Sequence, residues 1–259
     1  MKLKESTRRV GLARALSKLG YCSRSQAVRL ILAGHVRLND AVRRDPEAPV
    51  RLECDRITVN GRPVAAEHKI YLMMNKPRGL VTTAADEKGR ETVYARLTNW
   101  RPASNAAVAS HPWVAPVGRL DKASEGLLLL TNDSEWAAQV AAPETHLEKT
   151  YHVQIDTVAD EKLLQSLMQG ITEGADLLRA KGARLLRAGQ KDCWLEIILD
   201  EGKNRQIRRM FSALGIEVLR LVRVAIGPLQ LGNLGMGSFR PLTAIEKRAL
   251  DRAIARRPS

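Results

Sequence analysis

The sequence has few cysteines, few aromatic residues and no long apolar run. Three cysteines and ten aromatic residues occur among 259 residues, and no two cysteines form a C-x-x-C pair. A disulfide framework and a zinc finger are therefore not expected, and a reducing, cytoplasmic location is predicted. No apolar stretch approaches the roughly 18 residues that span a bilayer, so we expect no membrane partner.

Signatures of several common chemistries are also missing. There is no Walker loop, no G-x-G-x-x-G, no G-x-S-x-G and no H-E-x-x-H, and the five histidines are not spaced as a metal cluster. Nucleotide hydrolysis, dehydrogenase chemistry and metalloprotease chemistry are therefore not expected. At about 150 residues per domain, the length indicates one large domain or two unequal ones.

Acidic residues are scarce, above all near the amino terminus. The chain has 42 Lys and Arg against 28 Asp and Glu, and residues 1–37 hold nine basic residues and one acid. This balance points to an anionic partner, with nucleic acid as the first candidate. A solubilising surface or a transit peptide is the alternative, but the basic segment continues directly into a structured pattern.

The first 66 residues read as a small α/β module. Ser23 and Gln26 form a capping box that begins a helix, and an apolar stripe of leucines closed by Gly20 predicts another helix before it. Asn60-Gly61 is typical of a hairpin after a short strand. The two helices carry four basic residues that we expect to contact RNA phosphates: Arg14, Lys18, Arg24 and Arg29.

The remainder is predicted to be α+β with a mostly antiparallel sheet. Its strands are expected over the following ranges: 71–74, 127–130, 151–155, 195–199 and 218–226. Helices are expected after Asp133, over 207–214 and from the capping box at Thr243. The predicted domains are therefore 1–66, 67–243 and a basic carboxy-terminal helix over 244–259.

A loop motif precedes the four-leucine strand. Residues 118–126 read GRLDKASEG, and an Asp just before a buried strand is held on a rigid sheet. The motif alone favours a surface turn in which Asp121 accepts backbone hydrogen bonds, since loop aspartates are common. Glu125 raises the possibility of paired carboxylates, although one Asp-x-x-x-Glu is weak support.

Two further features suggest anion or base binding. Residues 201–209 place four cations at the start of an amphipathic helix, which indicates either a phosphate site or a solvated basic face. Tyr151 follows Lys149 on a predicted strand. A strand Tyr is usually a core residue, but an exposed ring beside a cationic cleft stacks on unpaired bases.

Taken together, these segments resemble the RsuA-type family of ribosomal RNA pseudouridine synthases. The resemblance rests on GRLDKASEGLLLLTND at 118–133, EKTYHVQI at 148–155, LDEGKNRQIRRMFSALG at 199–215, NKPRGLVTT at 75–83 and RLVRVAIGPLQLGNL…FRPLT at 220–243. The amino-terminal module is similar to the RNA-binding domain named from ribosomal small-subunit protein four, also called the alpha-L motif. Together these segments cover nearly the whole chain.

The resemblance implies isomerisation of a uridine in ribosomal RNA to pseudouridine without cofactor or metal. It implies that Asp121 is the catalytic carboxylate, which either attacks the anomeric carbon or removes the 2′ proton. Arg208 is its expected guanidinium partner, and Tyr151 is expected to stack on the extruded base and help to remove the proton from carbon 5. Arg119 is expected to contact the RNA, and the phosphate-contact candidates are Lys76, Lys203 and Arg205.

The predicted partner is ribosomal RNA or a ribosomal subunit precursor, bound by a monomer. Large-subunit RNA is slightly favoured, small-subunit RNA is the alternative, and a non-catalytic RNA- or ribosome-binding protein is the rival. A DNA-binding protein would also be basic, but it would not explain the GRLD motif. The stretch 98–117 is longer than the family's usual link; it is either an RNA-gripping loop or a surface insertion.

Overall fold

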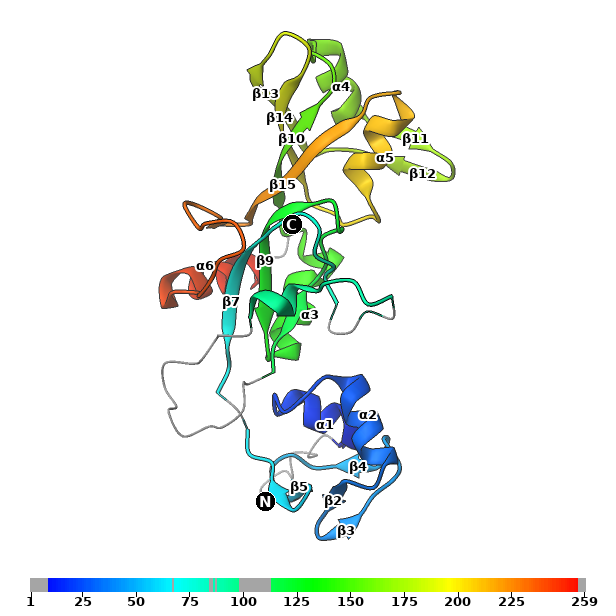
Figure 1. Ribbon diagram of the computed structural model, residues 1–259, viewed down its shortest axis with the longest axis vertical. Coiled ribbons are helices and arrows are strands. Elements are labelled where there is room, and N and C mark those ends of the chain that lie inside the picture. Colours follow the sequence, from blue (N-terminus) through cyan, green and yellow to red (C-terminus); the bar gives the residue numbers. More distant parts are fainter. Residues whose placement is uncertain (1–8, 67, 84–85, 87, 98–112, 256–259) are drawn as a thin grey trace, which may run out of the picture. The chain divides into compact units, whose positions relative to one another are not determined.

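The computed structural model describes residues 9–66, 68–83, 86, 88–97 and 113–255 (Figure 1). The chain is α+β, as predicted, and it divides into two compact units. The first takes in the described residues up to Tyr71, residues 113–115 and Leu130–Trp136. The second contains the remaining described residues from Leu72 onward. Most of the long stretch at 98–117 lies outside the described residues.

Two short helices and small sheets form the first unit. The helices are α1 (Leu12–Lys18) and α2 (Arg24–Leu32). The predicted capping box is confirmed, because Ser23 Oγ accepts from Gln26 N at 3.1 Å and Gln26 Oε1 accepts from Ser23 N at 3.0 Å. The buried side chains of both helices share one apolar cluster with the strands.

The strands of the first unit are short, and most are paired through tight turns. They are β1 (Val10–Gly11), β2 (Val36–Leu38), β3 (Ala41–Val42), β4 (Pro49–Val50), β5 (Ile57–Val59) and β6 (Arg62–Pro63). A four-stranded sheet has the order β3-β2-β5-β6, and β1 pairs with β4. The predicted hairpin joins β5 to β6, with both Asn60 and Gly61 at positive φ.

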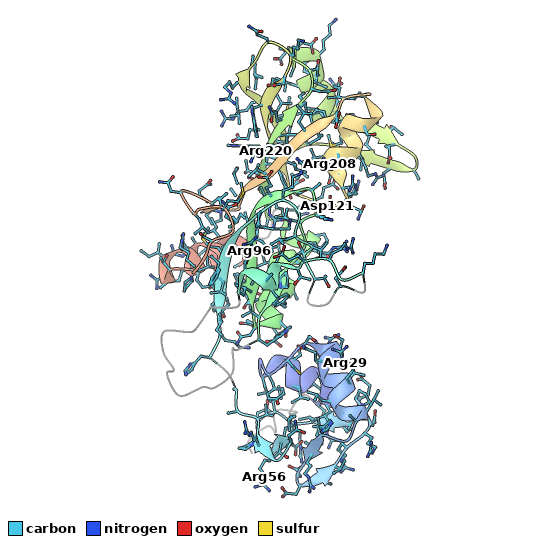
Figure 2. All side chains as sticks on the ribbon, in the orientation of Figure 1. Arg29, Arg56, Arg96, Asp121, Arg208 and Arg220 are labelled. Atoms are coloured by element: carbon cyan, nitrogen blue, oxygen red, sulfur yellow. The ribbon has the colours of Figure 1, made fainter. Side chains whose placement is uncertain are left out.

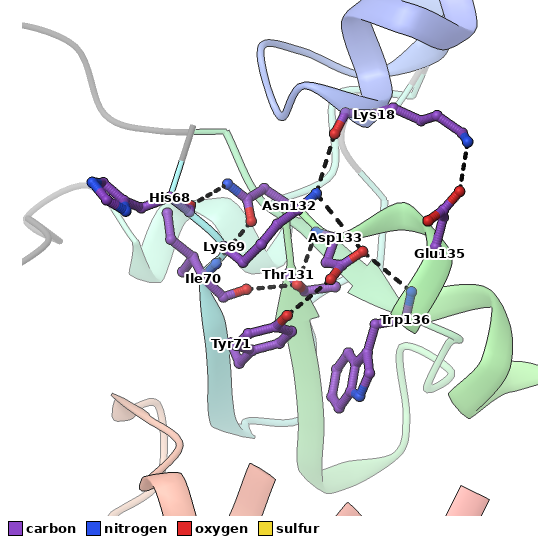
Figure 3. Close-up of polar contacts among 10 residues, drawn as sticks. All are labelled: Lys18, His68, Lys69, Ile70, Tyr71, Thr131, Asn132, Asp133, Glu135 and Trp136. Atoms are coloured by element: carbon purple, nitrogen blue, oxygen red, sulfur yellow. Dashed lines mark hydrogen bonds and ion pairs between the residues drawn. The ribbon is translucent and has the colours of Figure 1, made fainter. Parts of the chain in front are cut away.

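Polar side chains at the end of the four-leucine strand bind the backbone of the segment that follows the small sheets (Figure 3). Thr131 Oγ1 donates to Ile70 O at 2.6 Å, and Asn132 Nδ2 donates to His68 O at 2.9 Å. Tyr71 Oη donates to Asp133 Oδ2 at 2.8 Å. The first two of these bonds satisfy backbone oxygens of the segment before β7.

A nine-stranded sheet dominates the rest of the chain. Its strands are β7 (Tyr71–Lys76), β8 (Ala115–Val117), β9 (Glu125–Thr131), β10 (Lys149–Ile155), β13 (Gly182–Ala188), β14 (Cys193–Leu199), β15 (Val218–Ile226), β16 (Leu229–Gln230) and β17 (Phe239–Pro241). The main order is β13-β14-β10-β15-β9-β7-β17. The sheet is mostly antiparallel, as predicted, with a parallel contact between β9 and β15.

Helices and short elements complete this part of the fold. They are α3 (Ser134–Ala141), α4 (Glu161–Gln169), α5 (Gln206–Ala213), α6 (Ala244–Ala255), the 3-10 turns η1 (Val93–Arg96) and η2 (Pro143–Thr145), and the hairpin strands β11 (Ile171–Glu173) and β12 (Asp176–Leu178). The second predicted capping box is confirmed at α6, where Thr243 Oγ1 accepts from Glu246 N and Glu246 Oε2 accepts from Thr243 N.

The main core lies between the sheet and two helices. Apolar side chains of α4 and α5 pack against alternate residues of β10, β14 and β15. Strand β9 is buried at all seven positions, as its continuous apolar run predicts for a central strand. Asp121 lies directly before this strand, and α5 follows the loop that carries Lys203 and Arg205.

Among the described residues, no helix is both long and apolar enough to cross a bilayer.

Candidate active site

The loop that leads into β9 is held by a buried ammonium group. Lys76, at the end of β7, is completely inaccessible to solvent. Its Nζ donates to three carbonyl oxygens, Ser124 O at 2.8 Å, Pro77 O at 3.1 Å and Asp121 O at 3.2 Å. Burial lowers the pKa of Lys76 to about 8, although the charges of Asp121 and Glu125 oppose this shift. The prediction that Lys76 contacts RNA phosphates is therefore wrong, because its ammonium faces the protein interior.

The same segment holds the loop through two more contacts. Thr82 Oγ1 donates to Leu120 O at 2.7 Å, and Gly79 N donates to Lys122 O at 2.8 Å. With the bonds from Lys76 and one from α5, every backbone carbonyl from 120 to 124 accepts a hydrogen bond. The loop is thus restrained along its length, and a restrained backbone gives its side chains a defined direction.

Arg208, in the first turn of α5, supplies the remaining bond (Figure 2). Its Nη2 donates to Ala123 O and its Nη1 to Val218 O, both at 3.1 Å. Burial lowers the pKa of Arg208, the charge of Arg205 lowers it further, and the charge of Asp121 raises it. Arg208 therefore joins the helix to the loop backbone.

The Asp121 carboxylate forms an ion pair with a different arginine from the one predicted. Arg205 Nη1 lies 3.9 Å from Asp121 Oδ2, and both side chains are partly exposed. Arg208 makes no ion pair with Asp121 within 4 Å, since its guanidinium bonds backbone carbonyls. Arg205 reaches the loop because it caps α5 in the left-handed conformation, with φ of 48°.

Asp121 lines a pocket of about 500 Å³. Five of the predicted site residues line it: Arg119, Asp121, Tyr151, Lys203 and Arg205. Its apolar wall includes Leu199 of β14 together with Leu221 and Ile226 of β15. The pocket therefore joins a carboxylate, an aromatic ring and several cations over an apolar floor, as sites for small planar ligands often do.

Tyr151 comes from β10, and its ring is half-buried against the main core. It stands opposite Arg223 on the neighbouring strand β15. A ring that packs on the core while lining the pocket presents its remaining surface to a ligand. Tyr151 therefore packs on the core, and its predicted role in stacking on a base stays a prediction.

Gln206, for which the sequence predicts no role, fixes the loop before α5. Its buried Nε2 donates to Glu201 Oε1 at 2.6 Å and to Arg179 O at 3.0 Å. Its Oε1 accepts from Lys203 N at 3.3 Å. Lys203 Nζ donates to a backbone oxygen at 2.7 Å, so its ammonium has a partner within the protein. Arg119, by contrast, is exposed at the pocket rim.

Glu125 does not act as a second carboxylate in this pocket. Glu125 is buried, and its carboxylate accepts hydrogen bonds from Arg220, from Nη2 at 2.7 Å and from Nε at 3.2 Å. The Arg220 guanidinium also lies 5.7 Å from the Trp194 ring centroid. The pairing is structural, so the suggestion of paired carboxylates is not supported by the geometry.

Two cations at the pocket were missed in the sequence. Lys149 and Arg223 both line it, and Arg223 is 6% exposed. A signal existed for Arg223, because it occupies the inward position of a strand on which Leu221 and Ala225 are buried. A charge at such a position is uncommon and marks a candidate site.

Three of the four predicted cations of the first unit are free for RNA phosphates. Arg14, Arg24 and Arg29 are exposed and form no ion pair with the residues that the structure describes. Lys18 instead pairs with Glu135 at 2.5 Å (Figure 3), so its ammonium already has an anionic partner.

Within the described ranges, no three His, Cys, Asp or Glu side chains gather as a metal site.

Comparison with known proteins identifies the family of this chain. The model of the RNA pseudouridylate synthase family matches residues 70–213, and the S4 domain model matches residues 10–57. An uncharacterized RNA pseudouridine synthase of Aquifex aeolicus is 35% identical over 246 residues, which is 95% of both chains. The ribosomal large subunit pseudouridine synthase B of Bacillus subtilis is 35% identical over 94% of this chain and 96% of its own.

A solved structure shows the same fold. The crystal structure of a pseudouridylate synthase superposes with a TM-score of 0.63 at 28% identity, covering 93% of this chain and 99% of that one. The family resemblance seen in the sequence is thus confirmed over nearly the whole length. This chain is an RNA pseudouridine synthase with an amino-terminal S4 domain.

Proposed function

We propose that this enzyme isomerises a specific uridine of ribosomal RNA to pseudouridine, with Asp121 as the catalytic carboxylate. One observation supports this proposal above the others. All five backbone carbonyls from 120 to 124 accept hydrogen bonds, so the loop is restrained, and Asp121 on this loop lines the pocket. Large-subunit RNA is the favoured substrate, because the Bacillus subtilis relative carries that activity in its name. Small-subunit RNA is the alternative.

The reaction exchanges one bond to the sugar for another. The bond between the anomeric carbon and N1 breaks with its electron pair leaving on the uracil. The uracil turns over, carbon 5 bonds the anomeric carbon, and the carbon 5 proton is lost while N1 takes up a proton. Asp121 either attacks the anomeric carbon or removes the 2′ proton. Atoms balance in both routes without an external reactant.

The neighbouring residues divide the remaining tasks. Tyr151 stacks on the extruded base, which partly offsets the lost base stacking, and its hydroxyl is the candidate for receiving the carbon 5 proton. Arg205 balances the charge of Asp121, while Arg208 holds the loop backbone. Arg119 and Lys203 at the pocket wall are proposed to contact the RNA backbone.

The amino-terminal domain is proposed to anchor the RNA. Its exposed Arg14, Arg24 and Arg29 present charge without protein partners among the described residues. We assign residues 1–66 to this domain, 67–243 to the catalytic domain and 244–259 to a terminal helix. The partner is ribosomal RNA or a subunit precursor, the enzyme acts as a monomer, and the compartment is the cytoplasm where ribosomes are assembled.

Tritium release tests the proposal. Ribosomal RNA labelled at uridine carbon 5 loses tritium to water when pseudouridine forms. We expect release with the wild type and none with Asp121→Asn. Asp160→Asn is the control, since Asp160 caps α4 and Asn caps a helix equally well. Mapping the product then identifies the target uridine.

Other outcomes separate the alternatives. Absence of release by the wild type, on free RNA and on both ribosomal subunits, would favour a non-catalytic RNA-binding protein. Equal release by the wild type and Asp121→Asn would retain the reaction and exclude Asp121 as the carboxylate.

A further inference from the structure

A buried guanidinium at the pocket has a buried nitrogen without a partner among the described residues. Arg223 is 6% exposed, and its Nε donates to Leu127 O at 2.7 Å. Its Nη2 makes no hydrogen bond to any residue that the structure describes. Nor does a carboxylate lie within 4 Å of Arg223 in the described part of the chain. A buried cationic donor left unpaired is costly, which calls for an explanation.

The position of Arg223 directs it to the ligand side. It stands opposite Tyr151 across the β10–β15 ladder, and both side chains line the pocket. Lys149 lies two residues before Tyr151 on the same face of β10 and lines the pocket as well. Burial lowers the pKa of Lys149, and the charge of Arg223 lowers it further, so the two cations repel each other.

The surroundings favour a base over a phosphate. The floor near Arg223 includes the apolar Leu221 and Ile226 beside the Tyr151 ring. A phosphate group keeps much of its hydration and binds at exposed cations, whereas a planar base with carbonyl oxygens loses water readily against a ring. The exposed Arg119 at the rim is the better placed for the RNA backbone.

We propose that Arg223, assisted by Lys149, binds a carbonyl oxygen of the target uracil and stabilises the negative charge that this base acquires when the glycosidic bond breaks. This inference rests on the proposed isomerisation. The electron pair of the broken bond resides on N1 and is shared with the carbonyl oxygens. A preorganised donor at such an oxygen acts where charge develops.

Leaving-group dependence provides the test. Single-turnover rates are measured for the wild type and Arg223→Met on RNA containing uridine or 5-fluorouridine. Formation of the carbon-linked product is read by nuclease digestion and chromatography; on 5-fluorouridine RNA this product keeps its fluorine, because carbon 5 there has no proton to lose. Loss of one such donor lowers a rate by about 10²–10³-fold. We expect a loss of that size on uridine RNA and a distinctly smaller one on 5-fluorouridine RNA, because fluorine already stabilises the departing anion.

Matched variants keep the result interpretable. Arg187→Met removes an exposed arginine of β13 and is expected to leave both rates unchanged. Lys149→Met is expected to show a smaller loss with the same dependence on fluorine, and it serves if Arg223→Met does not fold. RNA affinity of every variant is expected to stay within about threefold of the wild type, since the phosphate contacts are retained.

Three results would overturn the inference. Equal losses on both substrates would mean that Arg223 only positions its neighbours. Weakened RNA affinity with an unchanged rate would assign Arg223 to the phosphate backbone. An unchanged rate would remove it from the reaction. If the wild type itself converts no uridine, it is the proposed isomerisation that fails.

Discussion

At the residue scale, the Lys76 ammonium shows how a charge can be used inside a protein. Its three carbonyl partners belong to the turn around Asp121 and to its own segment. Carbonyl dipoles compensate only part of the hydration that a buried charge loses. Lys76 therefore contributes order to the Asp121 loop at a cost in stability that depends on pH.

That cost gives a prediction for Lys76→Met. The pKa of Lys76 is about 8 in the folded protein and 10.5 in an unfolded chain. Between these values the unfolded chain binds more protons, so the wild type gains stability as pH rises. The unfolding free energy of the wild type minus that of Lys76→Met should increase by up to about 3 kcal/mol from pH 8 to 10.5, measured by urea unfolding.

The control for this experiment is Lys162→Met on the exposed side of α4. Its difference from the wild type should stay constant over the same pH range, because its ammonium is already in water. A constant difference for Lys76→Met as well would mean that Lys76 is hydrated in the folded protein.

Residue roles were predictable only in part. The family resemblance, rather than the loop motif alone, singles out Asp121 as the carboxylate that lines the pocket, because the motif by itself favours a surface turn. Sequence does not reveal the direction in which a cationic side chain points. The prediction of a phosphate contact for Lys76 therefore fails, because its side chain faces the interior. For the same reason the sequence predicts Arg208 as the partner of Asp121, whereas the structure places Arg205 there.

At the element scale, the parallel contact between β9 and β15 brings the Asp121 loop beside Arg223. Gly126 lies opposite Arg223 in this ladder, with φ of 100°. A Cβ atom at Gly126 would lie 2.3 Å from Arg223 O. This oxygen is a backbone atom of the neighbouring strand and cannot move aside as a flexible side chain could. The close approach of the two strands therefore requires glycine.

Gly126→Ala should destabilise the protein more than an otherwise similar change. Gly79 has nearly the same φ, 99°, but open space around its Cβ position. Both substitutions introduce the same backbone strain. Only Gly126→Ala adds a steric clash, which we expect to lower the unfolding free energy by about 2 kcal/mol more. Thermal or urea unfolding of the two variants measures the difference. Equal destabilisation would show that the strands separate easily at this point.

Sequence signals that involve only neighbouring residues explain which structural elements could be predicted. Both capping boxes and the Asn60-Gly61 hairpin depend on neighbours within four residues, and all three are confirmed. By contrast, no element was assigned between 160 and 190, although Asp160 caps α4 through Leu163 N at 2.8 Å. The strands after α4 are short or exposed, so their apolar alternation is weak, and β13 forms by pairing with β14.

At the scale of the whole molecule, binding energy for RNA is expected to come largely from cations of the S4 domain. Replacing Arg14, Arg24 and Arg29 together by Gln should weaken RNA binding. Each phosphate contact contributes about 0.7–0.9 to the slope of log affinity against log salt concentration, so three lost contacts reduce the slope by about 2 to 3. Filter binding or fluorescence anisotropy at several salt concentrations measures it.

A charge-matched variant distinguishes a binding face from net charge. Arg37, Arg43 and Arg56 are exposed on the strand side of the same domain, and Arg56 pairs with Asp40. Their replacement by Gln removes the same formal charge. It should nevertheless change the slope of log affinity against log salt concentration by less than one, because long-range attraction is screened at physiological salt while direct contacts are not. Equal slopes for the two triple variants would mean that the helices of this domain do not form the RNA-binding face.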